Sequence, residues 1–310
     1  AGAWAGGSDL LKVGLVGVGG RGTGAAEQAL NADPGTVLVA LGDAFEDAVA
    51  RGRRQLTRMF NKDGSAPRVT VDDDHAFVGF DAYKKVIECS DVVLLASTPH
   101  FRPEHLRASV EAGKHVFCEK PFMPTVEEAT RIVDLARQKN LLLRVNNQYR
   151  YMTFYAETKR RLQAGEFGRP YYIQCWQQMF HPPGKETNWR SSLKQYTLFE
   201  FGTHALDLAC FFFDALPETV NVFTPQVRPE FDADVLVNAT LRFPAERLAT
   251  FSFNRVTHAP EKYLEMRIDC EKASLRISLG GVARVSIDWA KNSRKFVLKH
   301  GFVRGGQARA

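Results

Sequence analysis

The spacing of apolar residues changes near the middle of the chain. Up to about residue 147, short apolar runs alternate with segments whose apolar residues recur at the helical interval, as in Val126–Lys139. Thr125 and Glu128 add a capping-box pattern at the start of that segment. The strands expected here are Leu11–Val16, Val37–Leu41, Val92–Ala96, His115–Cys118 and Leu141–Val145, and the helices are Thr23–Ala32, Glu46–Phe60, Pro103–Ala112 and Val126–Lys139. This alternation predicts an α/β fold that begins with a Rossmann domain, built on a doubly wound parallel sheet.

Beyond Arg150 the apolar residues follow a period of two, which is typical of strands with one buried face. The pattern is clearest in residues 235–242 and 275–279. Two helical segments, Tyr151–Ala164 and Gly202–Phe213, interrupt the strands. The other strands expected are Pro170–Gln178, Thr219–Thr224, Leu248–Asn254, Leu264–Asp269, Val282–Asp288 and Lys295–Leu298. We therefore expect a C-terminal α+β domain with a mostly antiparallel open sheet, and domains at residues 1–148 and 149–310.

The first apolar run ends in a glycine-rich turn. Its glycines follow the order G-x-G-x-x-G, in which the first allows the turn, the second lets the backbone approach a pyrophosphate and the third lets helix and strand pack closely. The helix that follows offers free N–H groups and a partial positive charge to phosphates. The residues expected to contact the cofactor here are Gly17, Gly19, Gly20, Arg21 and Gly22. A glycine turn without a ligand is the alternative.

Asp43 stands at the end of the second apolar run, about 20 residues past the last motif glycine, which is where an acidic side chain meets the ribose hydroxyls. Its carboxylate would repel a 2′-phosphate. The sequence therefore predicts a dinucleotide cofactor, and NAD rather than NADP.

Two further strands end in polar residues. Parallel doubly wound sheets bind ligands at the carboxyl ends of their strands, so these residues are expected on the cofactor side. They are Thr98, Pro99 and His100 after one strand, and Glu119 and Lys120, followed by Pro121, after the next.

A second candidate site lies in the helical segment that interrupts the C-terminal strands. Glu200, His204 and Asp207 are four and three residues apart, so all three can share one helix face. A histidine between carboxylates can be an oriented base or part of a metal site. A histidine satisfied within the core is the alternative.

The segments Gly17–Gly22, Asp43, Thr98-Pro99 and Glu111–Pro121 together closely resemble the Gfo/Idh/MocA oxidoreductase family. The resemblance implies that Lys120 sits beside the nicotinamide and contacts the reacting hydroxyl, and that the following proline is often cis. It also implies that His204 is the catalytic histidine and that Asp207 belongs to the same motif. Glu200 departs from the family, which usually has Asp there. The open sheet of the second domain is often used for oligomerisation, so a homo-oligomer is expected.

Residues expected to line a substrate site follow the last parallel strand or precede the His204 segment. Aromatic rings beside hydrogen-bonding groups suit sugars, because the ring covers C–H faces while the polar groups bind hydroxyls. For Trp176 and Trp189 a place in the core is the alternative. The residues are Asn146, Tyr149, Arg150, Trp176, Trp189 and Arg190.

Composition excludes several other classes. The 310 residues are 45% hydrophobic and 25% charged, as in an ordinary globular protein, and no apolar run is long enough for a membrane span. The net charge is +6, but the Lys and Arg residues are scattered along the chain, which argues against a nucleic-acid partner. The five cysteines lack metal or disulfide spacing, so no metal is expected. Residues 1–8 leave the location open between the cytoplasm and export after signal removal.

These observations predict an NAD-dependent oxidoreductase that oxidises a secondary hydroxyl of a sugar or polyol. Lys120 would stabilise charge on the oxygen, His204 would take the proton, and Glu200 or Asp207 would orient His204. An NAD-dependent glycoside hydrolase, which oxidises its sugar transiently and recycles the cofactor, is the alternative. A non-catalytic nucleotide or sugar sensor is a third hypothesis, which the presence of Lys120 and His204 disfavours.

Overall fold

The computed structural model describes residues 10–61, 65–180, 195–258, 263–279, 282–287, 292–296, 302–303 and 307–308. The chain divides into two compact units, Ala1–Asn146 and Asn147–Ala310. The expected boundary, after residue 148, lies two residues further along the chain.

The first unit is built on a six-stranded parallel sheet with the order β3-β2-β1-β4-β5-β6. Its strands are β1 (Leu11–Val16), β2 (Thr36–Asp43), β3 (Ala76–Val78), β4 (Val92–Leu95), β5 (His115–Cys118) and β6 (Leu143–Val145). Its helices are α1 (Gly20–Ala32), α2 (Glu46–Phe60), α3 (Ala82–Cys89), α4 (Arg102–Glu111) and α5 (Val126–Gln138). The order reverses between β1 and β4, so the predicted doubly wound Rossmann fold is confirmed.

Both faces of this sheet are covered by helices, which is why its strands are nearly continuous apolar runs. On one face, Leu30 of α1 and Leu56 of α2 pack against Leu15 and Leu38. On the other face, residues of α3, α4 and α5 pack in a second core around Val93. At the start of α5, the Thr125 side chain accepts a hydrogen bond from the backbone N–H of Glu128, as the predicted cap requires.

Two elements of the first unit were not expected from the sequence. Strand β3 has three residues and lies at the sheet edge, and α3 has eight residues, so neither is long enough to show a clear period. Helix α1 also begins at Gly20 rather than at Thr23. Three of its first five residues are glycines, which are poor helix formers, so propensity hides its start.

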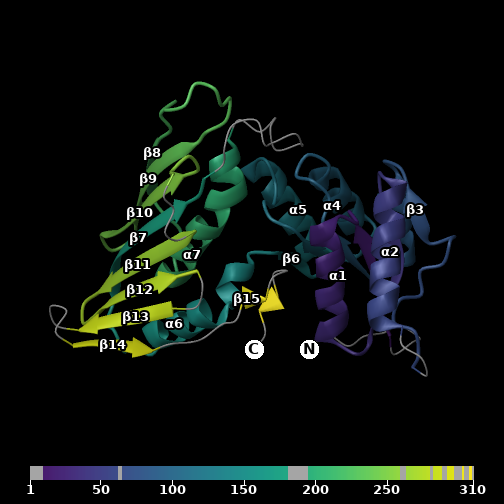
Figure 1. Cartoon of the computed structure of the whole chain (residues 1–310), viewed down its shortest axis with the longest axis horizontal. Coiled ribbons are helices and arrows are strands. Elements are labelled where there is room, and N and C mark those ends of the chain that lie inside the picture. Colours follow the sequence, from purple (N-terminus) through teal and green to yellow (C-terminus); the bar gives the residue numbers. More distant parts are fainter. Residues whose placement is uncertain are drawn as a thin grey trace. The chain divides into compact units, whose positions relative to one another are not determined.

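The second unit holds an eight-stranded sheet with the order β14-β13-β12-β11-β7-β10-β9-β8, which the strand labels of Figure 1 follow. All neighbours are antiparallel except β7 and β10. The strands are β7 (Pro170–Gln178), β8 (Thr219–Phe223), β9 (Leu236–Phe243), β10 (Arg247–Asn254), β11 (Leu264–Cys270), β12 (Ser274–Ser278), β13 (Val282–Ile287) and β14 (Asn292–Phe296). A separate pair, β15 (Phe302–Val303) and β16 (Gln307–Ala308), follows. The expected mostly antiparallel sheet is confirmed.

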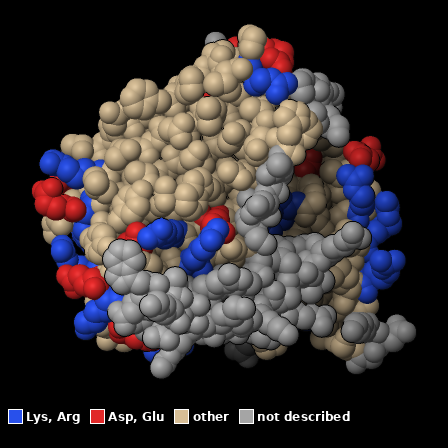
Figure 2. Space-filling view, turned by 60° about the vertical axis from the view of Figure 1, so that its left-hand side comes forward, with Lys and Arg blue, Asp and Glu red and all other residues tan. Residues whose placement is uncertain are grey.

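Helices cover one face of this sheet. Phe154 and Leu162 of α6 (Thr153–Gln163) and Leu208 of α7 (Thr203–Phe213) share a core with Ile173 and other inward strand residues. A short 3₁₀ helix, η1 (Gln148–Tyr151), precedes α6, and a π-helical turn, η3 (Thr197–Gly202), precedes α7. The outward residues of β9 are exposed, so the opposite face is open in this chain. Figure 2 brings the left-hand side of Figure 1 forward and shows a broad area with few charged residues.

Candidate active site

Gly17 and Gly22 make the β1–α1 turn possible. Gly17 has a φ of +91°, and a Cβ there would lie 2.6 Å from the backbone at Ala96 and Ser97, at the end of β4. A Cβ on Gly22 would lie 1.8 Å from the Gly17 carbonyl oxygen. Only glycine fits either position, so the first turn of α1 lies directly against β1 and β4.

The N-terminus of α1 is open to a ligand. Gly19 is its N-cap, with no side-chain capping bond and no acidic residue in the first turn. A Cβ on Gly19 or Gly20 would meet nothing within 4 Å. Unpaired N–H groups at the positive end of a helix form an anion site. The chain therefore has the cradle that a dinucleotide pyrophosphate requires.

Asp43, the last residue of β2, is held by the backbone around it. Its Oδ2 accepts a hydrogen bond from Val18 N at 2.6 Å, and its Oδ1 accepts one from Phe45 N at 3.1 Å. A carboxylate has about four lone-pair positions, so it retains capacity for ribose hydroxyls. Asp43 therefore faces the ligand side in a fixed orientation.

A cavity of about 390 Å³ opens beside this edge, entirely within the first unit. Asp43 and Thr98 line it, whereas Pro99 and His100 are not among its lining residues. Its walls are aromatic, with Phe45, Phe80, Phe101, Tyr83 and His105. The first three are at least 39% exposed and offer ring surface to a flat ligand such as adenine.

His105 lies in this aromatic wall. Its ring stacks on that of Tyr83 with centroids 4.2 Å apart, and its Nδ1 pairs with Ser97 Oγ at 3.1 Å. Burial lowers the pKa of His105 to about 4, so the ring is neutral near pH 7. Phe45, Phe80, Phe101 and His105 were not expected from the sequence. The available signal was that Phe45 and Phe101 lie in the loops that follow β2 and β4.

Glu119 links three strand ends at the cofactor edge. Its Oε1 accepts hydrogen bonds from Arg21 Nε at 2.6 Å and from Asn146 Nδ2 at 2.7 Å. Glu119 is 7% exposed and Asn146 is 9% exposed. The Glu119 carboxylate is thus committed to protein partners, and Asn146, expected at a substrate site, is one of them.

The residue after Glu119 is Lys120, and the Lys120–Pro121 peptide bond is cis, as the family resemblance implied. Arg102 holds this turn, since its Nη1 donates to Pro121 O at 2.7 Å and its Nη2 donates to Ser97 O at 2.6 Å. The side chain of Lys120 therefore extends from a turn whose backbone is held by a hydrogen bond from Arg102.

In the second unit, Glu200 and His204 are both buried, at 8% and 6% exposed. Glu200 lies in the π-helical turn η3, whereas His204 is the second residue of α7. The π turn was not expected from the sequence, and it runs directly into α7. That Glu200, His204 and Asp207 share one helix face stays a prediction. Asp234 caps η3, accepting hydrogen bonds from Thr197 N at 2.6 Å and from Leu198 N at 3.0 Å.

Asp207 makes its side-chain hydrogen bonds with the segment that opens the second unit. Arg150 donates to it twice at 2.6 Å, through Nε and Nη2, and Asn147 Nδ2 donates at 2.8 Å. The structure therefore does not bring Asp207 to His204. It ties Asp207 to the 3₁₀ helix η1, and Arg150 is occupied in that ion pair.

Tyr149, also in η1, lies on the His204 ring. Their centroids are 4.1 Å apart and the ring planes differ by 10°. The Tyr149 hydroxyl is hydrogen-bonded to Tyr263, whose oxygen also accepts from Gln177 Nε2 at 2.8 Å. Among the expected substrate residues, the structure brings Tyr149 to His204.

The other expected substrate residues lie elsewhere. Trp176 alternates along β7 with the buried Cys175 and Gln177, so it lies on the face of the sheet opposite α7. Trp189 and Arg190 lie outside the described residues.

Arg255 is a further buried charge, which was not expected from the sequence. It is 4% exposed, and its Cζ lies 3.6 Å from the centroid of the Tyr196 ring. Its charge acts on both Asp234 and Tyr263, lowering the pKa of each against the raising effect of burial. Its place directly after the end of β10 was the available signal.

Within the residues described, no group of three or more His, Cys, Asp and Glu side chains is arranged to hold a metal ion. In the same part of the chain, no helix has both the length and the apolar character needed to cross a membrane.

Two family models match the chain. Residues 11–147 match the model described as "Oxidoreductase family, NAD-binding Rossmann fold". Together with the glycine cradle, this match identifies residues 11–147 as an NAD-binding Rossmann domain of an oxidoreductase family. Residues 155–276 match the "GFO/IDH/MocA C-terminal domain". The chain belongs to the Gfo/Idh/MocA family.

Among curated relatives, levoglucosan dehydrogenase of Pseudarthrobacter phenanthrenivorans is 26% identical over 226 residues, or 62% of this chain and 57% of that protein. Inositol 2-dehydrogenase 4 of Saccharopolyspora erythraea is 34% identical over 168 residues, or 53% and 44%. The chain spans about half the length of the curated relatives it matches. These relatives are dehydrogenases and give no support to the glycoside hydrolase alternative.

Solved structures agree on the fold. Levoglucosan dehydrogenase in complex with NADH and L-sorbose has a TM-score of 0.78 at 22% identity, covering 94% of this chain and 80% of that one. An NAD binding oxidoreductase from Klebsiella pneumoniae also has a TM-score of 0.78, at 19% identity and the same coverage. At these identities the likeness shows the fold alone.

Proposed function

We propose that this protein is an NAD-dependent dehydrogenase that oxidises a secondary hydroxyl of a sugar or polyol. The observation that carries the proposal is the open N-terminus of α1 beside Asp43, which suits a nucleotide with a free ribose diol. The substrate class is supported by relatives named as dehydrogenases of levoglucosan and inositol.

The residues divide the work of binding and catalysis. The N–H groups at the start of α1 bind the pyrophosphate, Asp43 accepts hydrogen bonds from the ribose, and the aromatic walls hold the adenine. When bound, NAD supplies the hydride acceptor. The protein orients the cofactor and the substrate and stabilises the charge that develops during the reaction.

Lys120 and His204 are assigned to the substrate hydroxyl. The Lys120 ammonium group stabilises negative charge that develops on the oxygen, and His204 takes the hydroxyl proton. Glu200, buried in the turn before α7, favours the positive charge that His204 then carries. Asp207 is assigned a positioning role through Arg150 and Asn147 rather than a direct role on His204.

We propose homo-oligomer formation through the open face of the second sheet. On this face the large apolar side chains of Phe223 and Leu248 are at least 41% exposed, and they pair with Asn238 and Arg242, which are outward residues of β9. The broad area with few charges in Figure 2 supports the same proposal. Light scattering of the full chain tests it: a monomer at all concentrations would contradict it.

A substrate panel tests the enzymatic proposal. The full chain is incubated with NAD or NADP and with free sugars, polyols and their anhydro forms, while NADH absorbance is followed. Substrate-dependent NADH formation by at least one polyhydroxy compound is expected. Simple secondary alcohols serve as the control class. Turnover of these alcohols, but not of any polyhydroxy compound, would contradict the sugar or polyol assignment.

A further inference from the structure

The contact between Tyr149 and His204 joins two elements that are 55 positions apart in the sequence. Tyr149 is 7% exposed and His204 is 6% exposed. A parallel stack with centroids at 4.1 Å covers one whole face of the imidazole. Rotation of the His204 ring about its χ2 bond would drive its edge into the phenol, so the stack fixes the plane in which both ring nitrogens lie.

The far end of Tyr149 is anchored as well. Its hydroxyl is hydrogen-bonded to Tyr263, and Gln177 of β7 donates to the same Tyr263 oxygen at 2.8 Å. Burial raises the pKa of Tyr149 and raises that of Tyr263 to about 12. Both phenols therefore stay neutral near pH 7. Neutral phenols can hold the His204 ring in place, but they are not bases that would take the proton of the substrate hydroxyl.

The backbone of Tyr149 is tied to the helix that carries His204. Asn147 and Arg150 flank Tyr149 in the sequence, and both donate hydrogen bonds to Asp207, one turn beyond His204 on α7. Both the ring of Tyr149 and the turn that bears it are thus fixed relative to α7. This arrangement accounts for Asp207 without any direct contact to His204.

We infer that Tyr149 is a positioning residue that sets the plane of the His204 ring, with Asp207 holding the turn from which Tyr149 acts. The inference rests on the proposed function, in which His204 takes the substrate proton. A base must lie within hydrogen-bond reach and direction of the proton it abstracts. Misplacement by about 1 Å costs on the order of 100-fold in rate.

Three variants test the inference by steady-state kinetics. Tyr149→Leu removes the stack and is expected to lower kcat by about 10- to 100-fold, while the Kd for NAD stays unchanged. Tyr149→Phe keeps the ring and loses only the hydroxyl, so it is expected to restore kcat to within about threefold of the wild type. Phe243→Leu is the matched control, because Phe243 is a fully buried aromatic residue of the same core and its ring packs on Phe213. It is expected to lower thermal stability without lowering kcat.

NMR of the wild-type chain supplies a readout that does not depend on activity or on a folded Leu variant. The phenol ring current should shift the His204 ring protons upfield, and comparison with His204→Gln assigns their signal. The shift should persist in Tyr149→Phe. Absence of the upfield shift in the wild type would overturn the inference.

The kinetic outcomes also separate the inference from the proposed function. If His204→Ala abolishes turnover while Tyr149→Leu retains it, the positioning role is wrong and the function stands. If His204→Ala retains full turnover, the assignment of His204 as the base is wrong, and the role of Tyr149 fails with it. If the wild type oxidises no polyhydroxy compound, the proposed function itself is wrong.

Discussion

Arg21 in the first turn of α1 donates a hydrogen bond of 2.6 Å to Glu119, the residue before Lys120. This ion pair joins the glycine turn to the turn that carries Lys120. The Arg21 side chain is 40% exposed and that of Glu119 is 9% exposed, so the carboxylate depends on its partners more than the guanidinium does.

Arg21→Ala should therefore lower the free energy of unfolding. The buried Glu119 would lose its charged donor and retain the hydrogen bond from Asn146. A hydrogen bond to a charged group contributes about 1.5–3 kcal/mol, and the exposure of Arg21 places the expected loss near the lower limit. Urea denaturation measures it.

Arg137→Ala is the matched control for Arg21→Ala. Arg137 pairs with Asp134 on α5 at 3.2 Å, and both side chains are more than half exposed. Its loss should cost less than about 0.5 kcal/mol. Equal losses from the two variants would show that Glu119 does not depend on Arg21.

Asp43→Asn should narrow the preference for NAD over NADP. The wild-type carboxylate repels a 2′-phosphate, whereas the amide does not. The ratio of the Kd for NADP to the Kd for NAD should therefore fall by about 10-fold or more. Calorimetric titration with each cofactor measures this ratio. Asp47→Asn is the control, because Asp47 lines the same cavity but is 74% exposed and paired with Arg51. Equal NAD and NADP binding by the wild type would contradict the role of Asp43.

The cofactor edge was predictable from sequence because its signals are local. Gly17 and Gly22 are required by contacts within one strand-turn-helix unit, and Asp43 marks the end of the next strand. A short apolar run followed by glycines can form few other structures. The aromatic walls of the cavity were missed because Phe45 and Phe101 resemble ordinary apolar residues until the fold brings them together.

The second site was predictable only in part. The spacing of Glu200, His204 and Asp207 identified the segment, but not the π turn, which depends on the capping of η3 by Asp234 from a distant loop. The partner of Asp207 is likewise distant in sequence, since Arg150 lies 57 residues earlier. Helical spacing predicts which side chains can share a face. It does not predict which of them form contacts in the folded protein, because those contacts depend on tertiary packing.

His204→Ala should lower kcat by about 10² to 10⁴, the usual range for loss of a general base, with the Kd for NAD nearly unchanged. His204 lies in the second unit, whereas the glycine cradle and Asp43 lie in the first, so cofactor binding should survive the change. Cys210→Ala, on the same helix, controls for disturbance of α7 and should retain kcat. Near-full turnover by His204→Ala would refute the assignment.

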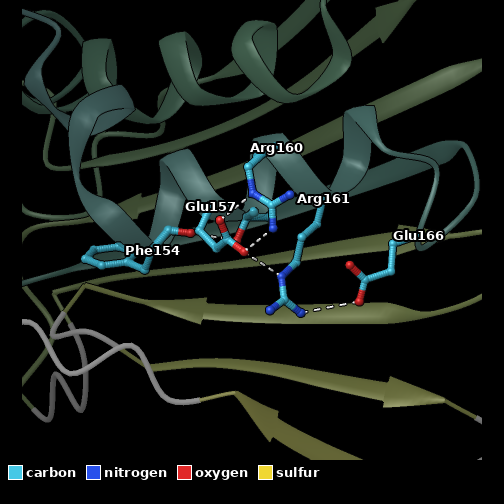
Figure 3. A network of polar contacts seen from close by, with 6 residues as sticks. Phe154, Glu157, Arg160, Arg161 and Glu166 are labelled. Atoms are coloured by element: carbon cyan, nitrogen blue, oxygen red, sulfur yellow. Dashed lines mark hydrogen bonds and ion pairs between the residues drawn. The ribbon is translucent and has the colours of Figure 1, made fainter.

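Glu157 on α6 lies between two guanidinium groups, as Figure 3 shows. Arg160 donates to both of its carboxylate oxygens at 2.7 Å, and Arg161 Nε donates at 2.8 Å. Arg161 also reaches Glu166 at 3.3 Å. The hydrogen bonds from Arg160 and then Arg161 lower the pKa of Glu157 from its ordinary value of 4.5 to about 2.

This pKa shift predicts how stability depends on pH. Because folding lowers the pKa, the unfolded chain takes up the proton first, so the contribution is fully present above about pH 4.5 and is lost as the pH falls toward 2. Glu157→Gln should therefore be less stable than the wild type at pH 7, by at most about 1 kcal/mol for an exposed helical network, and the difference should vanish toward pH 2. Urea denaturation at several pH values measures it. Glu127→Gln, at the start of α5, is the control for loss of a helix carboxylate in general. A difference between wild type and Glu157→Gln that stays constant from pH 7 to pH 2 would show that the ion pairs with Arg160 and Arg161 do not stabilise the fold.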